Sequence, residues 1–168
     1  MIAFRDAVPD DAPALVDLAR TSFTETFGHL YRAEDLAAFL AGHTLERWTA
    51  ELTDPAYAVR IGEVDGTAVA YAKLAPPSLP VEPAGPAIEL RKFYLLKPFH
   101  GRGHADTLMA WVLDTARARG ARELFLSVFV DNHRARRFYE RYGFAAIGVY
   151  AFIVGSHADE DHLMRLAL

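Results

Sequence analysis

The sequence predicts a single α/β domain (an α+β arrangement), with a mixed sheet flanked by helices. Strand-like and helix-like patterns alternate along all 168 residues, a length typical of one domain. Asp65-Gly66 lies between two strand-like segments, which is a strong signal for a hairpin and therefore for antiparallel pairing. A glycine-rich turn between a long strand and a helix adds a strand–turn–helix unit. Hydrophobic residues make up 52% of the chain and can fill a core, which excludes a disordered protein.

The first half of the chain is predicted as a strand, three helices and a hairpin. Pro9-Asp10-Asp11 indicates a helix start, because acids in the first turn favour the helix dipole and apolar residues then recur at helical spacing. The expected elements are a strand over 2–6, helices from 9, over 33–40 and over 45–52, and strands over 57–62 and 67–75.

The segment Pro76–Pro86 holds five of the nine prolines and is predicted to be an extended loop. We interpret it as an insertion between neighbouring strands, because the segments on either side are too short to fold separately. Beyond it we expect strands over 87–96, 124–130, 144–154 and 162–168, a helix ending at Gly120, and a basic helix over 132–142.

Charge is divided unevenly along the chain, although the net charge is only -4. Residues 91–137 hold ten basic and four acidic residues, a balance of +6, and the remainder holds eight and eighteen, a balance of −10. This pattern indicates an anionic ligand on one part and a cationic one on another. The absence of cysteine excludes disulfides, a cysteine zinc site and a thiol nucleophile. No secretory signal or apolar span is visible, so we expect a cytoplasmic protein without a membrane partner.

The chemistry centres on Gly101-Arg102-Gly103-His104-Ala105, between a strand and a helix. Small residues allow a tight bend and a close approach to backbone amides, and the helix N-terminus favours an anion. Phosphate binding follows, with Arg102 as an added charge. A P-loop is excluded because the required Lys-Ser/Thr is missing. A dinucleotide fingerprint is disfavoured by Asp106, where a small residue is expected, and by the lack of a suitably spaced acid.

The block His100–Ala105 resembles the cofactor loop of the GNAT superfamily of N-acetyltransferases, matching at Gly103 and Ala105 and departing at His100, where that family has Gln or Arg. A second block, Asn132-x-x-Ala135-x-x-Phe138-Tyr139-x-x-x-Gly143-Phe144, resembles the family's segment after the fifth strand. The order of elements resembles the GNAT layout over essentially the whole chain.

The resemblance implies a single GNAT-like domain over residues 1–168, with a mostly antiparallel sheet splayed in the middle to admit acetyl-CoA. It implies direct attack of a neutral amine on the thioester, with Tyr139 as the acid for the departing thiolate. Glu89 is the expected base, directly or through water, although an exposed position on the strand is an equal alternative. The expected cofactor-binding residues are Phe93, Tyr94, Leu95, His100, Gly101, Arg102, Gly103, His104, Ala105, Asp106, Asn132 and Arg136.

Within the family, the segments around Glu89–Leu95 and the C-terminal strands resemble bacterial polyamine (spermidine/spermine-type) acetyltransferases. The leading acceptor is therefore a polyamine or a similar small cation. A protein N-terminus, a lysine or an aminoglycoside stays open as an alternative, and so does a non-catalytic acetyl-CoA sensor. His100 and His104 stand four apart, but without a third ligand we expect no metal, and we expect no nucleic-acid partner. A homodimer is an open expectation.

Overall fold

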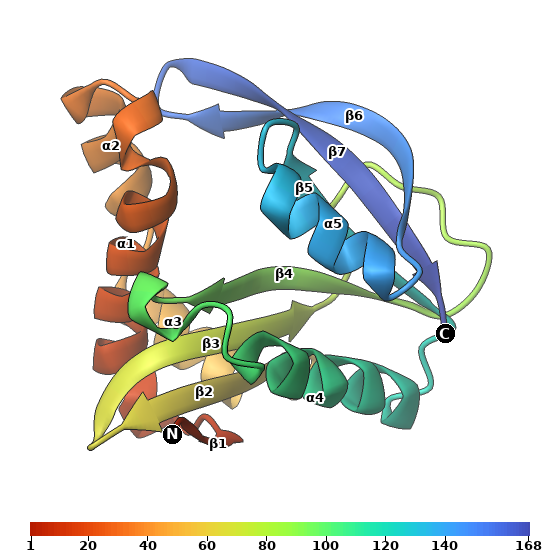
Figure 1. Cartoon of the computed structure of the whole chain (residues 1–168), viewed down its shortest axis with the longest axis horizontal. Helices are drawn as coiled ribbons and strands as arrows, with labels where there is room; N and C mark the ends of the chain where they lie inside the picture. Colours follow the sequence, from red (N-terminus) through yellow and green to blue (C-terminus); the bar gives the residue numbers. More distant parts are fainter.

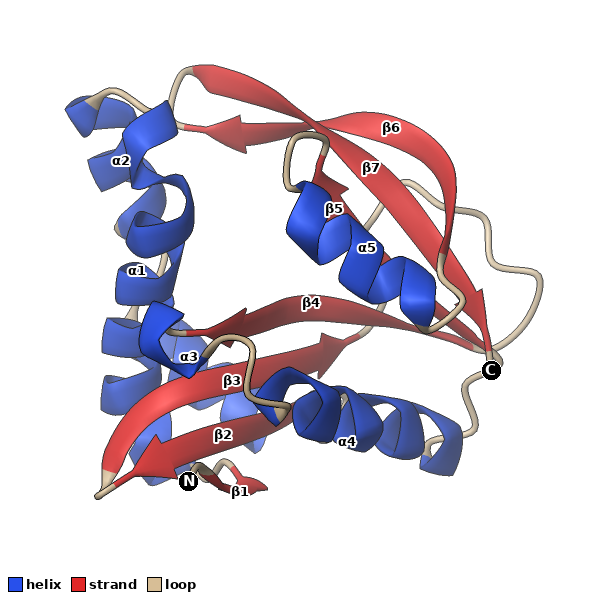
Figure 2. Ribbon diagram, viewed as in Figure 1, coloured by secondary structure: helices blue, strands red, loops and turns tan.

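The computed structural model describes all 168 residues, arranged as seven strands and five α-helices (Figures 1 and 2). The strands are β1 (Ala3–Asp6), β2 (Ala58–Val64), β3 (Thr67–Ala75), β4 (Ala87–Leu95), β5 (Glu123–Phe129), β6 (Ala145–Val154) and β7 (His157–Ala167). The helices are α1 (Ala12–Phe27), α2 (Ala33–Leu40), α3 (Leu45–Thr53), α4 (His104–Ala118) and α5 (His133–Arg141). None of these helices is long and apolar enough to cross a membrane.

The strands form one sheet in the order β1-β2-β3-β4-β5-β7-β6. β4 and β5 are parallel, and every other neighbouring pair is antiparallel. The parallel pair is short, because it joins only residues 87–89 to 123–125. Beyond Glu89, β4 stays paired with β3 and β5 with β7, so the two halves of the sheet diverge (Figure 1). The predicted mixed, mostly antiparallel sheet with a splayed middle is confirmed.

The β2–β3 hairpin forms where the sequence predicts it. Asp65 and Gly66 both have positive φ, 50° and 76°. Positive φ at both central residues is typical of the two-residue turn whose twist matches that of the flanking strands.

Helices cover both faces of the sheet. Tyr71 of β3 packs in a buried cluster with Leu15 of α1 and Trp48 of α3. The next residue along β3, Ala72, belongs to the cluster that contains Met109 of α4. Because side chains alternate between the two faces of a strand, α1 and α3 cover one face and α4 covers the other. This alternation decides on which side of the sheet each site residue lies.

The proline-rich segment 76–86 is a loop between β3 and β4, as predicted, and two buried carboxylates hold it in place. Two of its backbone amides donate to Oε1 of Glu89, each at 3.0 Å. Two more donate to Oε1 of Glu123, at 2.6 and 3.0 Å. Since Glu89 and Glu123 belong to the short parallel pairing, the loop is tied to the region from which the two sheet halves diverge.

β7 begins earlier than the sequence predicts. We expected a strand over 162–168, whereas the strand starts at His157. Residues 157–161 include three acids and have low strand propensity, but they pair with the end of β6 and so become a strand. The turn between β6 and β7 is fixed by Asp35 of α2, which accepts hydrogen bonds from the amide and hydroxyl of Ser156 at 2.7 and 2.8 Å. The hairpin therefore reaches α2 (Figure 1).

Candidate active site

A cleft of about 460 Å³ lies where β4 and β5 diverge. Along Leu90–Leu95, β4 has no partner strand on the β5 side, so its main-chain polar groups on that side face the cleft. An extended molecule can pair with this free edge as an added strand would. Phe93, Tyr94 and Leu95, which were expected to hold the cofactor arm, all line the cleft.

The glycine-rich loop closes one end of the cleft and leads into α4. Gly101 and Gly103 have φ values of 72° and 79°, which glycine adopts without strain. A side-chain carbon added at either position would meet no other atom within 4 Å. The loop therefore bends tightly and leaves open space beside the unpaired amides of the α4 N-terminus, where the helix dipole favours a phosphate. This cradle fits the diphosphate of coenzyme A.

The predicted loop residues divide into two groups. Those that line the cleft are His100, Gly101, Gly103, Ala105 and Asp106, and those that do not are Arg102 and His104. Asp106 also joins the start of α4 to the end of α5, because its carboxylate accepts hydrogen bonds from Tyr142 at 2.5 Å and Arg141 at 3.2 Å. Burial and the bond to Asp106 raise the pKa of Tyr142 to about 12.

His100 braces the loop at its first residue. Arg134 of α5 lies 2.7 Å from Nδ1 of His100. A guanidinium can only donate, so Nδ1 accepts and the ring proton is assigned to Nε2. Nε2 then donates to the main-chain oxygen of Leu95, at 2.7 Å. The residue that departs from the family pattern thus links the end of β4 to α5 and occupies one of the carbonyls of β4.

Helix α5 and its cap supply further groups to the cleft. Asn132 caps the helix, because its side-chain oxygen accepts from a first-turn amide at 3.3 Å, and it also lines the cleft. Arg136 does not line the cleft and lies 3.7 Å from Glu140. Arg134 and Arg141 line it instead. Arg136 was the basic residue of this helix expected from the sequence, whereas the structure places Arg134 and Arg141 at the cleft.

Tyr139 lies on the side of α5 that faces the cleft and is 9% exposed. Its ring packs against Phe93 and Phe144, with centroids 6.2 and 5.7 Å apart. Burial raises the pKa of Tyr139 well above its usual value. No protein group forms a hydrogen bond with its hydroxyl, so the phenol remains protonated and free to donate within the cleft.

Asp159 and Asp161 of β7 line the same cleft, and sequence reasoning missed both. Asp161 is 6% exposed, and burial raises its pKa to about 6. Asp159 accepts a hydrogen bond from Tyr31, which follows α1. Because the expected strand began at residue 162, nothing in the pattern indicated that these two acids would be paired or buried.

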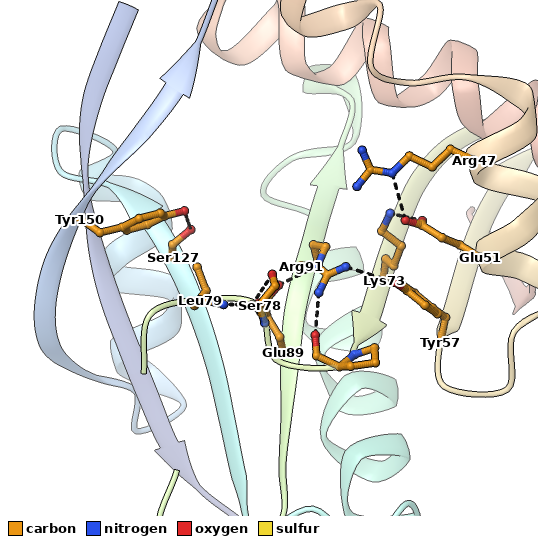
Figure 3. A network of polar contacts seen from close by, with 11 residues as sticks. Arg47, Glu51, Tyr57, Lys73, Ser78, Leu79, Glu89, Arg91, Ser127 and Tyr150 are labelled. Atoms are coloured by element: carbon orange, nitrogen blue, oxygen red, sulfur yellow. Dashed lines mark hydrogen bonds and ion pairs between the residues drawn. The ribbon is translucent and has the colours of Figure 1, made fainter. Parts of the chain in front are cut away.

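A second cavity, of about 470 Å³, adjoins the first and is bounded by α2, α3, β6 and the proline-rich loop. The residues that line both cavities are Leu90, Arg91, Lys92, Ser127 and Phe152, so the two meet where the sheet halves diverge. Figure 3 shows the polar network of this region. Glu51 of α3 accepts from the ammonium of Lys73 and, at 3.3 Å, from Arg47, and Ser127 lies 3.2 Å from the hydroxyl of Tyr150.

Glu89, the expected base, lies in the wall of the second cavity and is 3% exposed. Arg91 donates to its Oε2 at 2.7 Å, and Ser78 and Leu79 donate through their amides to its Oε1 (Figure 3). The hydroxyl of Ser78 lies 3.2 Å from both oxygens. The carboxylate is therefore engaged by the proline-rich loop and by a guanidinium.

We expect Glu89→Gln to lower the free energy of unfolding by about 3 kcal/mol, because breaking a buried ion pair leaves Arg91 uncompensated. Denaturant unfolding measures this change in free energy. The control is Glu82→Gln, which removes the charge of an exposed acid in the same loop. If the variant keeps wild-type stability and instead loses turnover, Glu89 is the base that the sequence suggested rather than an anchor for the loop.

The family model described as the acetyltransferase (GNAT) family matches residues 12–144, a span that includes the glycine loop and Tyr139. The chain belongs to the GNAT family. The predictions of an N-acetyltransferase and of acetyl-CoA as its cosubstrate are thereby confirmed, and acetyl-CoA is the molecule whose diphosphate the glycine loop fits.

Other GNAT proteins resemble it over nearly their whole length. An uncharacterized N-acetyltransferase of Mycobacterium tuberculosis is 36% identical over 155 residues, which cover 92% of this chain and 96% of the relative. PaiA N-acetyltransferase from Thermoplasma acidophilum, solved in complex with coenzyme A, superposes with a TM-score of 0.80 at 20% identity, covering 100% of this chain and 99% of the other. NAA60 of Arabidopsis thaliana, solved with a bisubstrate analogue, has a TM-score of 0.76 at 15% identity, with coverage of 100% and 99%. Because these two solved structures are only 20% and 15% identical to this chain, the likeness shows a shared fold alone.

Proposed function

We propose that this GNAT enzyme transfers the acetyl group of acetyl-CoA to a primary amine where the two cavities meet. One observation carries the proposal: the free edge of β4, Tyr139 and Asp161 line one cleft that ends at the glycine loop. When bound there, acetyl-CoA supplies the thioester that the amine attacks. Because the chain has no cysteine, no thiol nucleophile is available to carry the acetyl group in between.

The chain supplies an acid and a base for this reaction. Burial raises the pKa of Tyr139, so its phenol stays protonated and is available to donate a proton to the departing thiolate. The acceptor is an ammonium ion near neutral pH, so a base has to remove one proton before attack. We assign this step to Asp161, which is buried and lines the cleft, whereas the oxygens of Glu89 are engaged by Arg91 and the proline-rich loop.

With Asp161 as the base, kcat is expected to fall about tenfold per pH unit below about 6, because the carboxylate is ionised above its pKa and protonated below it. Measuring kcat between pH 5 and 9 at saturating substrates tests this. The acidic limb should disappear in Asp161→Asn and persist in Glu160→Gln, a substitution of the adjacent exposed acid. An unchanged limb in Asp161→Asn would assign the base elsewhere.

The resemblance of the segments around Glu89–Leu95 and the C-terminal strands to bacterial polyamine acetyltransferases favours a polyamine or similar small cation as the acceptor. The carboxylates of Asp159 and Asp161 support an ammonium group in the cleft. The second cavity does not favour a chain of several ammonium groups, because its lining includes Arg47, Lys73 and Lys92. A panel of polyamines, amino acids, peptides and aminoglycosides, followed by CoA release, tests the proposed function. Tight binding of acetyl-CoA without acetylation of any amine would indicate the alternative, a non-catalytic sensor. The homodimer and the cytoplasmic location stay predictions.

A further inference from the structure

The second cavity contains more cations than anions. Its lining includes four basic side chains, here called the cationic cluster: Arg47, Lys73, Arg91 and Lys92. The two carboxylates in the lining, Glu51 and Glu89, leave an excess of two positive charges. His43 adds none, because burial lowers its pKa to about 4 and keeps the ring neutral near pH 7. An excess of charge in a partly buried site is costly unless a counter-charge is supplied.

The two carboxylates are already engaged by three of the four cations. Lys73 donates to Glu51, and Arg47 lies 3.3 Å from the same carboxylate. Arg91 donates to Glu89 at 2.7 Å and to the main-chain oxygen of Pro76 at 2.6 Å. These contacts hold the three side chains within the protein's own network (Figure 3).

Lys92 is the exception. It is half-buried and forms no ion pair or hydrogen bond with the protein, and its ammonium lies 5.9 Å from the centroid of the Phe39 ring. Burial and the neighbouring charges of Lys73 and Arg47 lower the pKa of Lys92 to about 8, so it is still mostly protonated at pH 7. Lys92 is among the residues that line both cavities. A cation without a partner therefore lies where the acceptor has to meet the acetyl group.

The diphosphate of coenzyme A is not the missing counter-charge. Lys92 pairs with Lys73 across β3–β4, two positions from the Tyr71–Tyr94 pair, so these side chains share one face of the sheet. That face is the one covered by α1 and α3, whereas α4, whose N-terminus bears the glycine loop, packs on the opposite face. The anion that Lys92 can bind thus belongs to a molecule in the second cavity.

We propose that the acceptor is an amine that also carries a carboxylate, as amino acids do, and that Lys92 binds this carboxylate. This inference rests on the proposed function, because the cavity that Lys92 lines is taken as the route of the acceptor. The two ends of such a molecule have complementary partners, since Asp161 lines the first cavity and Lys92 lines both. Under this proposal a polyamine is a poor acceptor, because the cationic cluster repels its additional charges.

Pairs of amines that differ only by the carboxylate test the inference: lysine against cadaverine, ornithine against putrescine, and phenylalanine against phenylethylamine. Binding is measured by calorimetry on the enzyme saturated with CoA, which has no acetyl group to transfer. We expect the carboxylated member of at least one pair to bind about 10- to 100-fold more tightly, as one charge-assisted hydrogen bond provides. Lys92→Met should abolish this preference, Lys92→Arg should retain it, and Lys97→Met, the exposed control, should leave it unchanged.

Equal binding within every pair, or a preference that survives Lys92→Met, would overturn the inference. Turnover of the same pairs with acetyl-CoA separates it from the proposed function. If no amine is acetylated although the carboxylated members bind through Lys92, the proposed function fails and the binding site stands. If Lys92→Met lowers kcat for both members of a pair equally, Lys92 acts in the reaction and the assigned role in recognition is wrong.

Discussion

Replacing Tyr139 by Phe is expected to lower kcat by about 100- to 10,000-fold, the range that a positioned proton donor contributes. Tyr139 lines the cleft and no protein group forms a hydrogen bond with its hydroxyl, so removing the hydroxyl deletes the proposed proton donor and little else. Phe keeps the packing of the ring against Phe93 and Phe144, so the melting temperature should change little. Steady-state kinetics with the best amine of the panel and CoA release as readout measures the effect.

The comparison variant is Tyr57→Phe, which removes a phenol hydroxyl that lies outside the cleft lining and 3.5 Å from Arg91. It should retain turnover. Calorimetric titration of Tyr139→Phe with acetyl-CoA should show wild-type affinity, because none of the phosphate-binding groups is altered. Undiminished turnover of every amine by Tyr139→Phe would show that another group, or solvent, protonates the thiolate.

Replacing Gly103 by Val is expected to weaken acetyl-CoA binding by about 100-fold or more. The new side chain would occupy the open space beside the α4 amides, and the loss of two charge-assisted hydrogen bonds to phosphate is sufficient for an effect of this size. The backbone at this residue has a φ of 79°, which also strains any L-residue other than glycine. Titration of acetyl-CoA into the purified variant measures the dissociation constant.

Gly120 provides a matched control, because its φ is 80° and an added side-chain carbon there would also meet no atom within 4 Å. Gly120 lies at the opposite end of α4, away from the cleft. Gly103→Val and Gly120→Val should therefore lose similar amounts of unfolding free energy, and only the first should lose acetyl-CoA affinity. Equal affinities in the two variants would mean that the phosphates bind elsewhere.

The fold was largely readable from the sequence, because its signals are local. The Asp65-Gly66 turn, the proline-rich loop, the glycine cap of α4 and the Asn132 cap of α5 depend on φ angles and hydrogen bonds within a few residues. The first half of β7 was not readable, because residues 157–161 form a strand only through pairing with β6 and docking of the turn on Asp35.

The charges of the site were harder to predict. The basic stretch from Arg91 onward was expected to bind one anionic ligand, but Arg91 and Lys92 lie at the junction and line the second cavity as well as the first. Conversely, the acids of the cleft, Asp159 and Asp161, come from the strand whose start was placed too late. Linear charge counting cannot assign residues to the two faces of a sheet, because adjacent residues of a strand point in opposite directions.

The sequence by itself determined the family and its cosubstrate, because the glycine loop and the Asn132–Phe144 block are contiguous segments that can be recognised without the fold. The tertiary structure alone decided which charges face the acceptor. The divergence of β4 from β5 opens the cleft, and it brings Asp161, Tyr139 and Lys92 together from three elements distant in the chain. Burial raises the pKa of Asp161, and Lys92 has no ion-pair partner. Both facts depend on the folded arrangement and could not be read from any single segment.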